Sequence, residues 1–118
     1  MNLLTTIAVS VVILLHVFFM VLEMFLWTRP YGRKTFGLSE QLANNTATLA
    51  ANQGLYNGFL AAGLLWGLLS TGGFDALVFF LGCIIIAGIY GAFTVKPSIL
   101  WIQALPATIA LFLVIANF

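Results

Sequence analysis

Four long apolar segments dominate the sequence and decide what the chain can fold into. They cover approximately residues 3–27, 53–70, 74–94 and 98–117. A helix needs about 20 predominantly apolar residues to cross the hydrocarbon core of a bilayer, and each segment approaches that length. We therefore predict an all-α protein, an integral membrane four-helix bundle whose spans occupy nearly the whole chain as one domain, residues 1–118.

The composition agrees with a membrane protein and argues against a water-soluble one. Hydrophobic residues make up 63% of the 118 residues and charged residues 6%, so polar groups are too few to cover the apolar surface. No basic stripe is present, and we predict no nucleic-acid binding. The first apolar segment lacks a basic region before it and a small-residue cleavage pattern after it, so we expect it to be retained.

The connections between the segments carry turn residues and the basic charges. Their turn motifs are Arg29-Pro30-Tyr31-Gly32, Thr71-Gly72-Gly73 and Lys96-Pro97-Ser98. All four basic residues lie in the first and third connections, whereas Asp75 is the only charged residue near the second. Because basic loops stay on the cytoplasmic side, we predict cytoplasmic basic loops and both termini outside.

Residues 39–52 differ from the apolar segments, because leucines there alternate with asparagines and threonines. Ser39 is a suitable N-cap, and Glu40 suits the positive end of a helix dipole. We predict an amphipathic cytoplasmic extension of the second span. The sequence leaves open whether this helix runs straight into the membrane or bends at Gly54.

A histidine and a glutamate interrupt the first apolar segment. Glu23 follows His16 by seven residues, so both fall on one helix face, about 10 Å apart along the axis. An unpaired charge at the bilayer centre costs roughly 2.5 to 3.5 kcal/mol on insertion scales, so this face should point at protein or water. For Glu23 the alternatives are an ion pair with Arg29 or Arg33, a place at the lipid head groups, ligand binding and proton transfer.

His16 is suited to a hydrogen bond between helices, which is a common use of polar residues in membranes. We predict no metal site, because the sequence has one histidine and its only cysteine, Cys83, lies in another apolar segment. The single cysteine also excludes an internal disulfide. The residues identify no cofactor.

Polar residues open the second span at about the depth of Glu23. They form either a hydrogen-bond network that fixes the helices or a pocket for an amphipathic molecule with an anionic head. The candidate ligand-binding residues are Glu23, Arg29, Arg33, Asn52, Gln53, Tyr56 and Asn57. If the protein is an enzyme, which the sequence does not decide, the catalytic candidates are Glu23, His16 and Tyr56.

Small residues recur at four-residue intervals on the second and third spans, as in Gly54 and Gly58 or Gly88 and Ala92. Such ridges let helices approach closely, within one subunit or between subunits. Four short helices leave little interior, so we expect a homo-oligomer, a dimer or a trimer. The predicted partners are therefore further copies of the chain, membrane lipids and an amphipathic small molecule.

Three stretches resemble a bacterial family of small membrane proteins catalogued as domain of unknown function thirteen hundred and four. They are residues 23–30 (EMFLWTRP), 32–38 (GRKTFGL) and 49–63 (LAANQGLYNGFLAAG). The resemblance covers essentially the whole chain. It implies a multi-pass protein of the bacterial cytoplasmic (inner) membrane with four helices, and it brings no established activity.

The chain is more loosely similar to the membrane-associated eicosanoid and glutathione metabolism (MAPEG) superfamily, whose members have four helices, a basic cytoplasmic loop and outward termini. There an arginine, an asparagine and an acid on the second helix hold glutathione in trimers. The matching positions here are Ala50, Gly54 and Asn57. The resemblance therefore implies a MAPEG-like architecture with a site between subunits, without glutathione chemistry.

Two other functions remain open. Small multidrug exporters are also four-helix proteins with a single membrane glutamate on the first helix that exchanges protons for cations, and Glu23 invites that comparison. Their glutamate lies deep in the span, whereas Glu23 is near its cytoplasmic end. The third alternative is a structural or regulatory subunit whose polar layer contacts another membrane protein.

Overall fold

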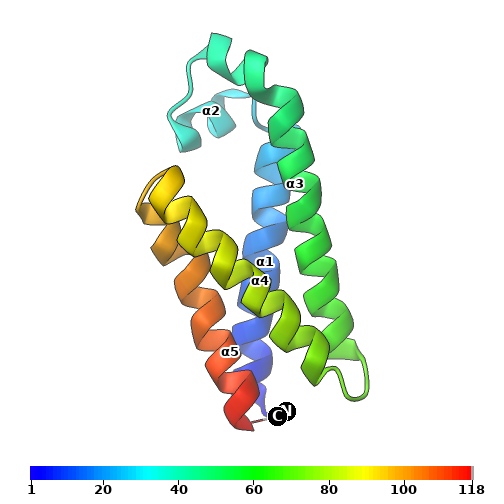
Figure 1. Cartoon of the computed structure of the whole chain (residues 1–118). Helices are drawn as coiled ribbons and strands as arrows, with labels where there is room; N and C mark the ends of the chain where they lie inside the picture. The colour runs from blue at the N-terminus through cyan, green and yellow to red at the C-terminus, as the bar shows by residue number, and fades with distance from the viewer. Residues whose placement is uncertain (118) are drawn as a thin grey trace. The chain divides into compact units, whose positions relative to one another are not determined.

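A computed structural model describes residues 1–117, and it is helical throughout apart from short connections. Its elements are α1 (Leu3–Phe25), α2 (Pro30–Phe36), α3 (Glu40–Leu69), α4 (Phe74–Thr94), the π-helical turn η1 (Leu100–Ala104) and α5 (Leu105–Asn117) (Figure 1). No strand occurs among these residues. The prediction of an all-α protein is confirmed.

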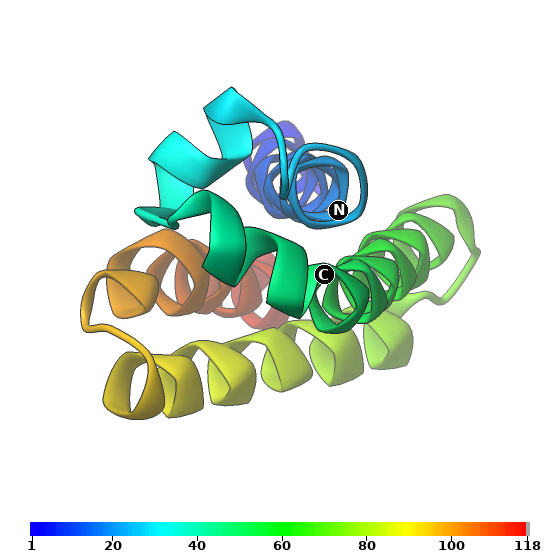
Figure 2. The ribbon, with the colours of Figure 1, turned by 90° about the horizontal axis from the view of Figure 1, so that it is seen from above.

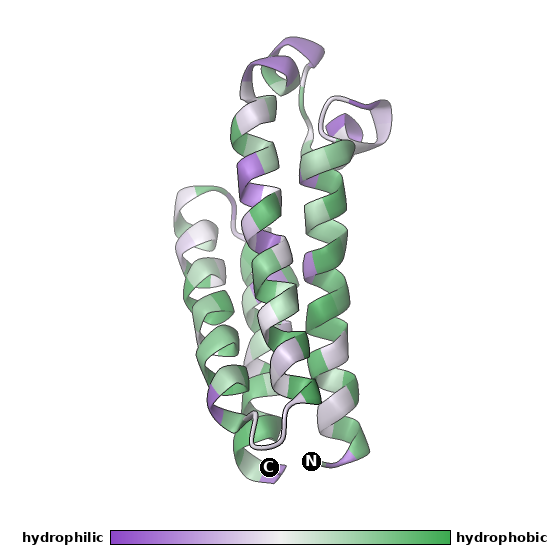
Figure 3. Cartoon of the chain, turned by 90° about the vertical axis from the view of Figure 1, so that its right-hand side faces the viewer, coloured by the Kyte–Doolittle hydropathy of each residue, from purple (hydrophilic) through white to green (hydrophobic). Residues whose placement is uncertain are grey.

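Three helices are long and apolar enough to cross a membrane: α1, α4 and the helix Leu100–Asn117 that joins η1 to α5. They also expose large apolar side chains, for example Ile86 at 70% and Phe93 at 87%, which water would disfavour and lipid would accept. The 30-residue α3 is not among them, because its first half is rich in asparagine and threonine, as the purple bands of Figure 3 show. A fourth span and the membrane topology therefore stay predictions.

The contacts divide the chain into two compact units. Residues 1–14 and the chain from residue 60 onward form the first unit, and residues 15–59 form the second. The core of the first unit comes from four helices: Val9, Val12, Leu64, Leu77, Leu81, Ile84, Ala107, Ala110 and Val114. Gly88 lets α4 approach the following helix, because a Cβ there would lie 2.7 Å from the backbone nitrogen of Ala104. One of the predicted small-residue ridges thus serves packing within the chain.

The π-helical turn before α5 was not predicted from the sequence. Pro106 lies inside the last helix, where proline has no N–H to donate and its ring would meet the carbonyl group four residues earlier. Just before it, the Leu105 N–H donates to the Leu100 carbonyl, five residues back. This wider turn gives the proline ring room without ending the helix.

The second unit contains a short helix, α2, where the sequence analysis expected only a turn. Pro30 stands at its first position, where a missing N–H is harmless. Gly37 ends it with a positive φ of 66°, and the Leu38 N–H donates to the Arg33 carbonyl at 2.8 Å. This pair of signals, an initial proline and a final left-handed glycine, defines a helix with a Schellman C-cap.

Helix α3 begins as predicted and continues without interruption to Leu69. The Leu42 N–H donates to the Ser39 hydroxyl at 3.1 Å, which makes Ser39 the N-cap. Gly54 lies in the middle of the helix and does not break it. The amphipathic stretch and the more apolar stretch are thus one helix that is continuous through Gly54.

Candidate functional site

A carboxylate and an amide join α1 to α3 in the second unit. The Asn57 side-chain Nδ2 donates a hydrogen bond to the Glu23 carboxylate oxygen Oε1. Asn57 is 5% exposed, and Glu23 is part-buried two residues before the end of α1. Among residues 1–117 Asn57 is the partner of Glu23, and neither Arg29 nor Arg33 forms an ion pair with it. The carboxylate therefore holds two helices together and leaves both arginines unneutralised.

Glycines on α3 make the close approach to α1 feasible. A Cβ on Gly54 would lie 2.7 Å from Met24 Cγ and 3.0 Å from Glu23 Cβ, and one on Gly58 would lie 2.7 Å from Met20 Sδ. The thioether side chains of α1 thus fill the space above and below the hydrogen bond. Methionine suits this role because its flexible, polarizable chain adapts to irregular gaps.

Trp27, just after α1, contacts both α2 and α3. Its indole Nε1 donates to the Thr46 hydroxyl at 3.0 Å, and its ring lies 4.8 Å from the Phe36 ring. The backbone of Gly32 passes so close to the Leu26 carbonyl that a Cβ would overlap the oxygen. Seen down α1, α2 runs across the direction of α1 (Figure 2). Its position is therefore fixed by one hydrogen bond, one ring contact and one glycine.

Replacing Trp27 by phenylalanine tests this attachment. The phenyl ring can still pack on Phe36 but cannot donate to Thr46, so we expect a loss of about 0.5 to 1.5 kcal/mol of unfolding free energy. Thermal unfolding in detergent, followed by circular dichroism, measures the loss. Trp66→Phe is the matched control, because Trp66 is 63% exposed. Equal losses from the two variants would show that the indole hydrogen bond contributes nothing.

Helix α2 carries a cationic cluster of three residues. Arg29 is its N-cap, while Arg33 and Lys34 lie in its last turn. The side chains of Arg29 and Lys34 are exposed, whereas Arg33 is partly buried and its Nε, which has no solvent contact, has no hydrogen-bond partner. A buried donor left unpaired costs about 1 to 3 kcal/mol, and more on a charged group. Among residues 1–117 no carboxylate forms an ion pair with any of the three cationic side chains.

The remaining predicted site residues lie elsewhere on the second unit. Asn52, Gln53 and Tyr56 are exposed on α3, and the Tyr56 ring makes an edge contact with Phe59, with centroids 5.7 Å apart. The fully buried His16 ring packs edge-on against Phe19 at 5.3 Å. The structure thus brings Glu23 and Asn57 together, while the wider ligand-binding and catalytic assignments stay predictions.

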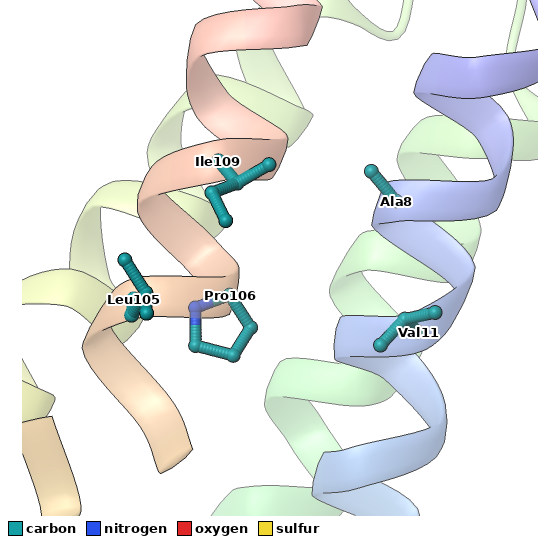
Figure 4. Close-up of a pocket in the computed structure, with 5 residues that line it drawn as sticks. All are labelled: Ala8, Val11, Leu105, Pro106 and Ile109. Carbon is teal, nitrogen blue, oxygen red and sulfur yellow. The ribbon is translucent and has the colours of Figure 1, made fainter. Parts of the chain in front are cut away.

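The first unit holds an apolar groove between α1 and the last helix, drawn in Figure 4. Its volume is about 220 Å³, and its lining residues are Ala8, Val11, Leu105, Pro106 and Ile109. No polar side chain lines it, so it offers only packing surface. Among the described residues no group of three or more histidine, cysteine, aspartate or glutamate side chains could hold a metal ion.

Sequence reasoning did not identify Met24 or the Trp27–Thr46 bond as parts of this region, and it gave Met20 no packing role. For the methionines the sequence offered only their spacing, three residues before Glu23 and one residue after it. Their contacts with Gly54 and Gly58 come from the structure. For the tryptophan no sequence signal existed. The chain between Trp27 and Thr46 contains α2, and the direction of the chain through α2 was not predicted.

Comparison with known proteins gives the family. The chain belongs to the family described as protein of unknown function (DUF1304), whose model matches residues 10–115. This confirms the first resemblance. No curated protein and no solved structure matches the chain. The looser MAPEG resemblance stays a prediction.

Proposed function

We propose that this member of the DUF1304 family is a multi-pass protein of the bacterial cytoplasmic membrane that binds an amphipathic molecule by its anionic, phosphate-like head. The observation that carries the proposal is the cationic cluster of α2, whose three side chains form no ion pair within residues 1–117. A guanidinium presents its N–H groups in a planar fork that matches two oxygens of a phosphate. Arg33 would donate hydrogen bonds to the phosphate-like head group, and Arg29 and Lys34 would add positive charge around it.

The place of the cluster in the chain favours an amphipathic ligand over a fully soluble one. Arg29 follows the end of α1, a candidate membrane span, by four residues. Basic residues beside a span lie near the anionic lipid surface, where each contributes about 1 kcal/mol of attraction. A ligand held here would keep its head at α2 and its tail beside the exposed apolar side chains at the end of α1, such as Phe25.

The Glu23–Asn57 bond serves this proposal indirectly. A carboxylate on the same unit could neutralise Arg33 and compete with an anionic ligand. Asn57 holds Glu23 instead, so the guanidinium stays available. In this proposal Glu23 has a structural role, because its hydrogen bond with Asn57 joins α1 to α3. The competing hypotheses are a proton-coupled exporter that uses Glu23, a regulatory subunit, and an enzyme that uses Glu23, His16 or Tyr56.

Lipid retention by Arg33→Gln tests the proposal. Glutamine keeps polarity and similar length but loses the charge and the fork, so we expect about a tenfold or greater loss of phosphatidylglycerol retention. Native mass spectrometry of the protein in detergent counts the lipids bound. Phosphatidylcholine should bind weakly to both proteins, and free glycerol phosphate should compete only weakly, because it lacks the tail.

Lys96→Gln is the control variant, because Lys96 is an exposed basic residue in the connection after α4. It removes the same charge and should keep the retention of the unaltered protein. Equal retention by Arg33→Gln and the unaltered protein would reject the head-group site. Strong competition by free glycerol phosphate would reject the amphipathic ligand in favour of a soluble anion.

A further inference from the structure

One face of α3 carries an exposed stripe with the spacing of a coiled-coil seam. Its residues follow one another at intervals of three and four: Leu42, Asn45, Leu49, Asn52, Tyr56 and Phe59. Every one of them is exposed, with Leu49 at 74% and Tyr56 at 55%. Alternating three- and four-residue steps keep side chains on one line along a helix. The stripe is about 25 Å long at 1.5 Å per residue.

The stripe lies opposite the face by which α3 contacts α1. The buried side of α3 in the second unit is formed by Ala43, Ala50, Gly54 and Asn57. At about 100° per residue, this side points roughly half a turn away from the stripe. The stripe is therefore free to contact a partner without disturbing the Glu23–Asn57 bond.

Neither water nor lipid suits the stripe. Exposed leucines and aromatic rings are unfavourable in water, and exposed asparagine amides are unfavourable in hydrocarbon, where their hydrogen bonds would be unmade. Because the two kinds of side chain alternate along one helix face, no depth in the membrane satisfies both. A surface with the same alternation satisfies both.

We infer that the partner on this stripe is a second copy of the same chain, packed with the two α3 helices parallel and in register. Copies inserted into a membrane with the same topology necessarily run parallel. In a parallel pair each seam residue meets its own equivalent, so leucine faces leucine and asparagine faces asparagine. This inference rests on the stripe and on the proposed insertion into a membrane, and it does not depend on the proposed ligand.

The amides make this self-pairing specific. A carboxamide both donates and accepts, so the Asn45 side chains of two copies can hydrogen-bond each other, and so can those of Asn52. A buried asparagine at a seam position fixes the register of a coiled coil, because a shifted pair would leave it unsatisfied. The stripe contains no charged residue, so two copies meet without like-charge repulsion.

Cysteine cross-linking tests the inference with a matched pair of variants. In a Cys83→Ser background, Asn45→Cys places a thiol on the stripe, and Asn44→Cys places one on the next exposed position, about 100° around the helix. A disulfide requires Cα atoms about 4.4 to 6.8 Å apart. Oxidation in reconstituted vesicles should give a species of twice the chain mass for Asn45→Cys and at least about tenfold less for Asn44→Cys.

A charge variant provides a second, independent measurement. Asn52→Asp keeps the size of the side chain but puts two carboxylates face to face, which should weaken self-association at least about tenfold. Asn44→Asp adds the same charge off the stripe and should leave self-association unchanged. Native mass spectrometry in detergent reads the oligomer directly, with circular dichroism as the check on folding. Equal cross-linking at positions 44 and 45, no cross-link at 45, or an oligomer insensitive to Asn52→Asp would each overturn the inference.

Discussion

Replacing Gly32 by alanine is expected to detach α2 from the rest of the second unit. The added Cβ would overlap the Leu26 carbonyl oxygen, a backbone atom that cannot rotate away as a side chain could. We expect a loss of about 3 kcal/mol or more of unfolding free energy, at the upper end of the range for overpacking. Thermal unfolding measures the loss, and faster trypsin cleavage after Arg33 and Lys34 reports the detachment of α2 itself.

Gly82→Ala is the matched control for this substitution. A Cβ at Gly82 meets nothing within 4 Å, and the residue lies inside α4. Alanine is the better helix former by about 1 kcal/mol, so this variant should be neutral or more stable. The two alanine substitutions should thus change stability in opposite directions. If Gly32→Ala resists heat and trypsin as the unaltered protein does, the packing of α2 described above is wrong.

The second large effect is expected from Asn57→Leu. Without the amide donor, the part-buried Glu23 carboxylate loses its hydrogen-bond partner, which should cost about 1 to 3 kcal/mol of unfolding free energy. Glu23→Gln keeps an acceptor oxygen at the same place and should cost less. Reversible unfolding in mixed detergent, followed by circular dichroism, compares the two variants.

A double-mutant cycle separates the pairing of the two side chains from their individual contributions. Glu23→Leu and Asn57→Leu each leave one polar side chain without its hydrogen-bond partner, whereas the double variant removes both polar side chains. The double variant should therefore lose less stability than the two single variants together, by about 0.5 to 3 kcal/mol. Additivity within about 0.3 kcal/mol would mean that the hydrogen bond does not hold α1 and α3 together.

Much of the fold could be predicted because apolar segments of span length read directly as helices. The predicted segments 3–27 and 74–94 correspond to α1 and α4. The helix cap at Ser39 was also predictable, because a serine before an acidic residue is a local signal. The helix α2 was missed because Pro30 and Gly32 were interpreted as turn residues, and Gly37, which ends the helix, was given no structural role. The π-helical turn compensates for Pro106, and a sequence does not show how a chain makes that adjustment.

For the candidate site, the sequence predicted the depth of the residues in the membrane but not the direction in which each side chain leaves its helix. Asn52, Gln53, Tyr56 and Asn57 start the second predicted span at one level, yet each residue turns the helix by about 100°. Asn57 alone of these shares the buried line of Ala43, Ala50 and Gly54, so it alone reaches Glu23. The methionines of α1 pack on the glycines of α3, and this packing decides which face of α3 contacts α1. That packing is a tertiary property, which one helix does not reveal.

The distance between Arg33 and a lipid phosphorus atom tests the proposed function most directly. Solid-state nuclear magnetic resonance of the protein, labelled with ¹³C in arginine and embedded in phosphatidylglycerol bilayers, measures the dipolar coupling between the guanidinium Cζ and ³¹P. A hydrogen-bonded pair places these nuclei about 4 to 5 Å apart, and the signal lost in Arg33→Gln assigns the coupling. The proposal predicts such a coupling from Arg33. A spectrum in which only Arg29 couples to phosphorus, or neither arginine does, would contradict it.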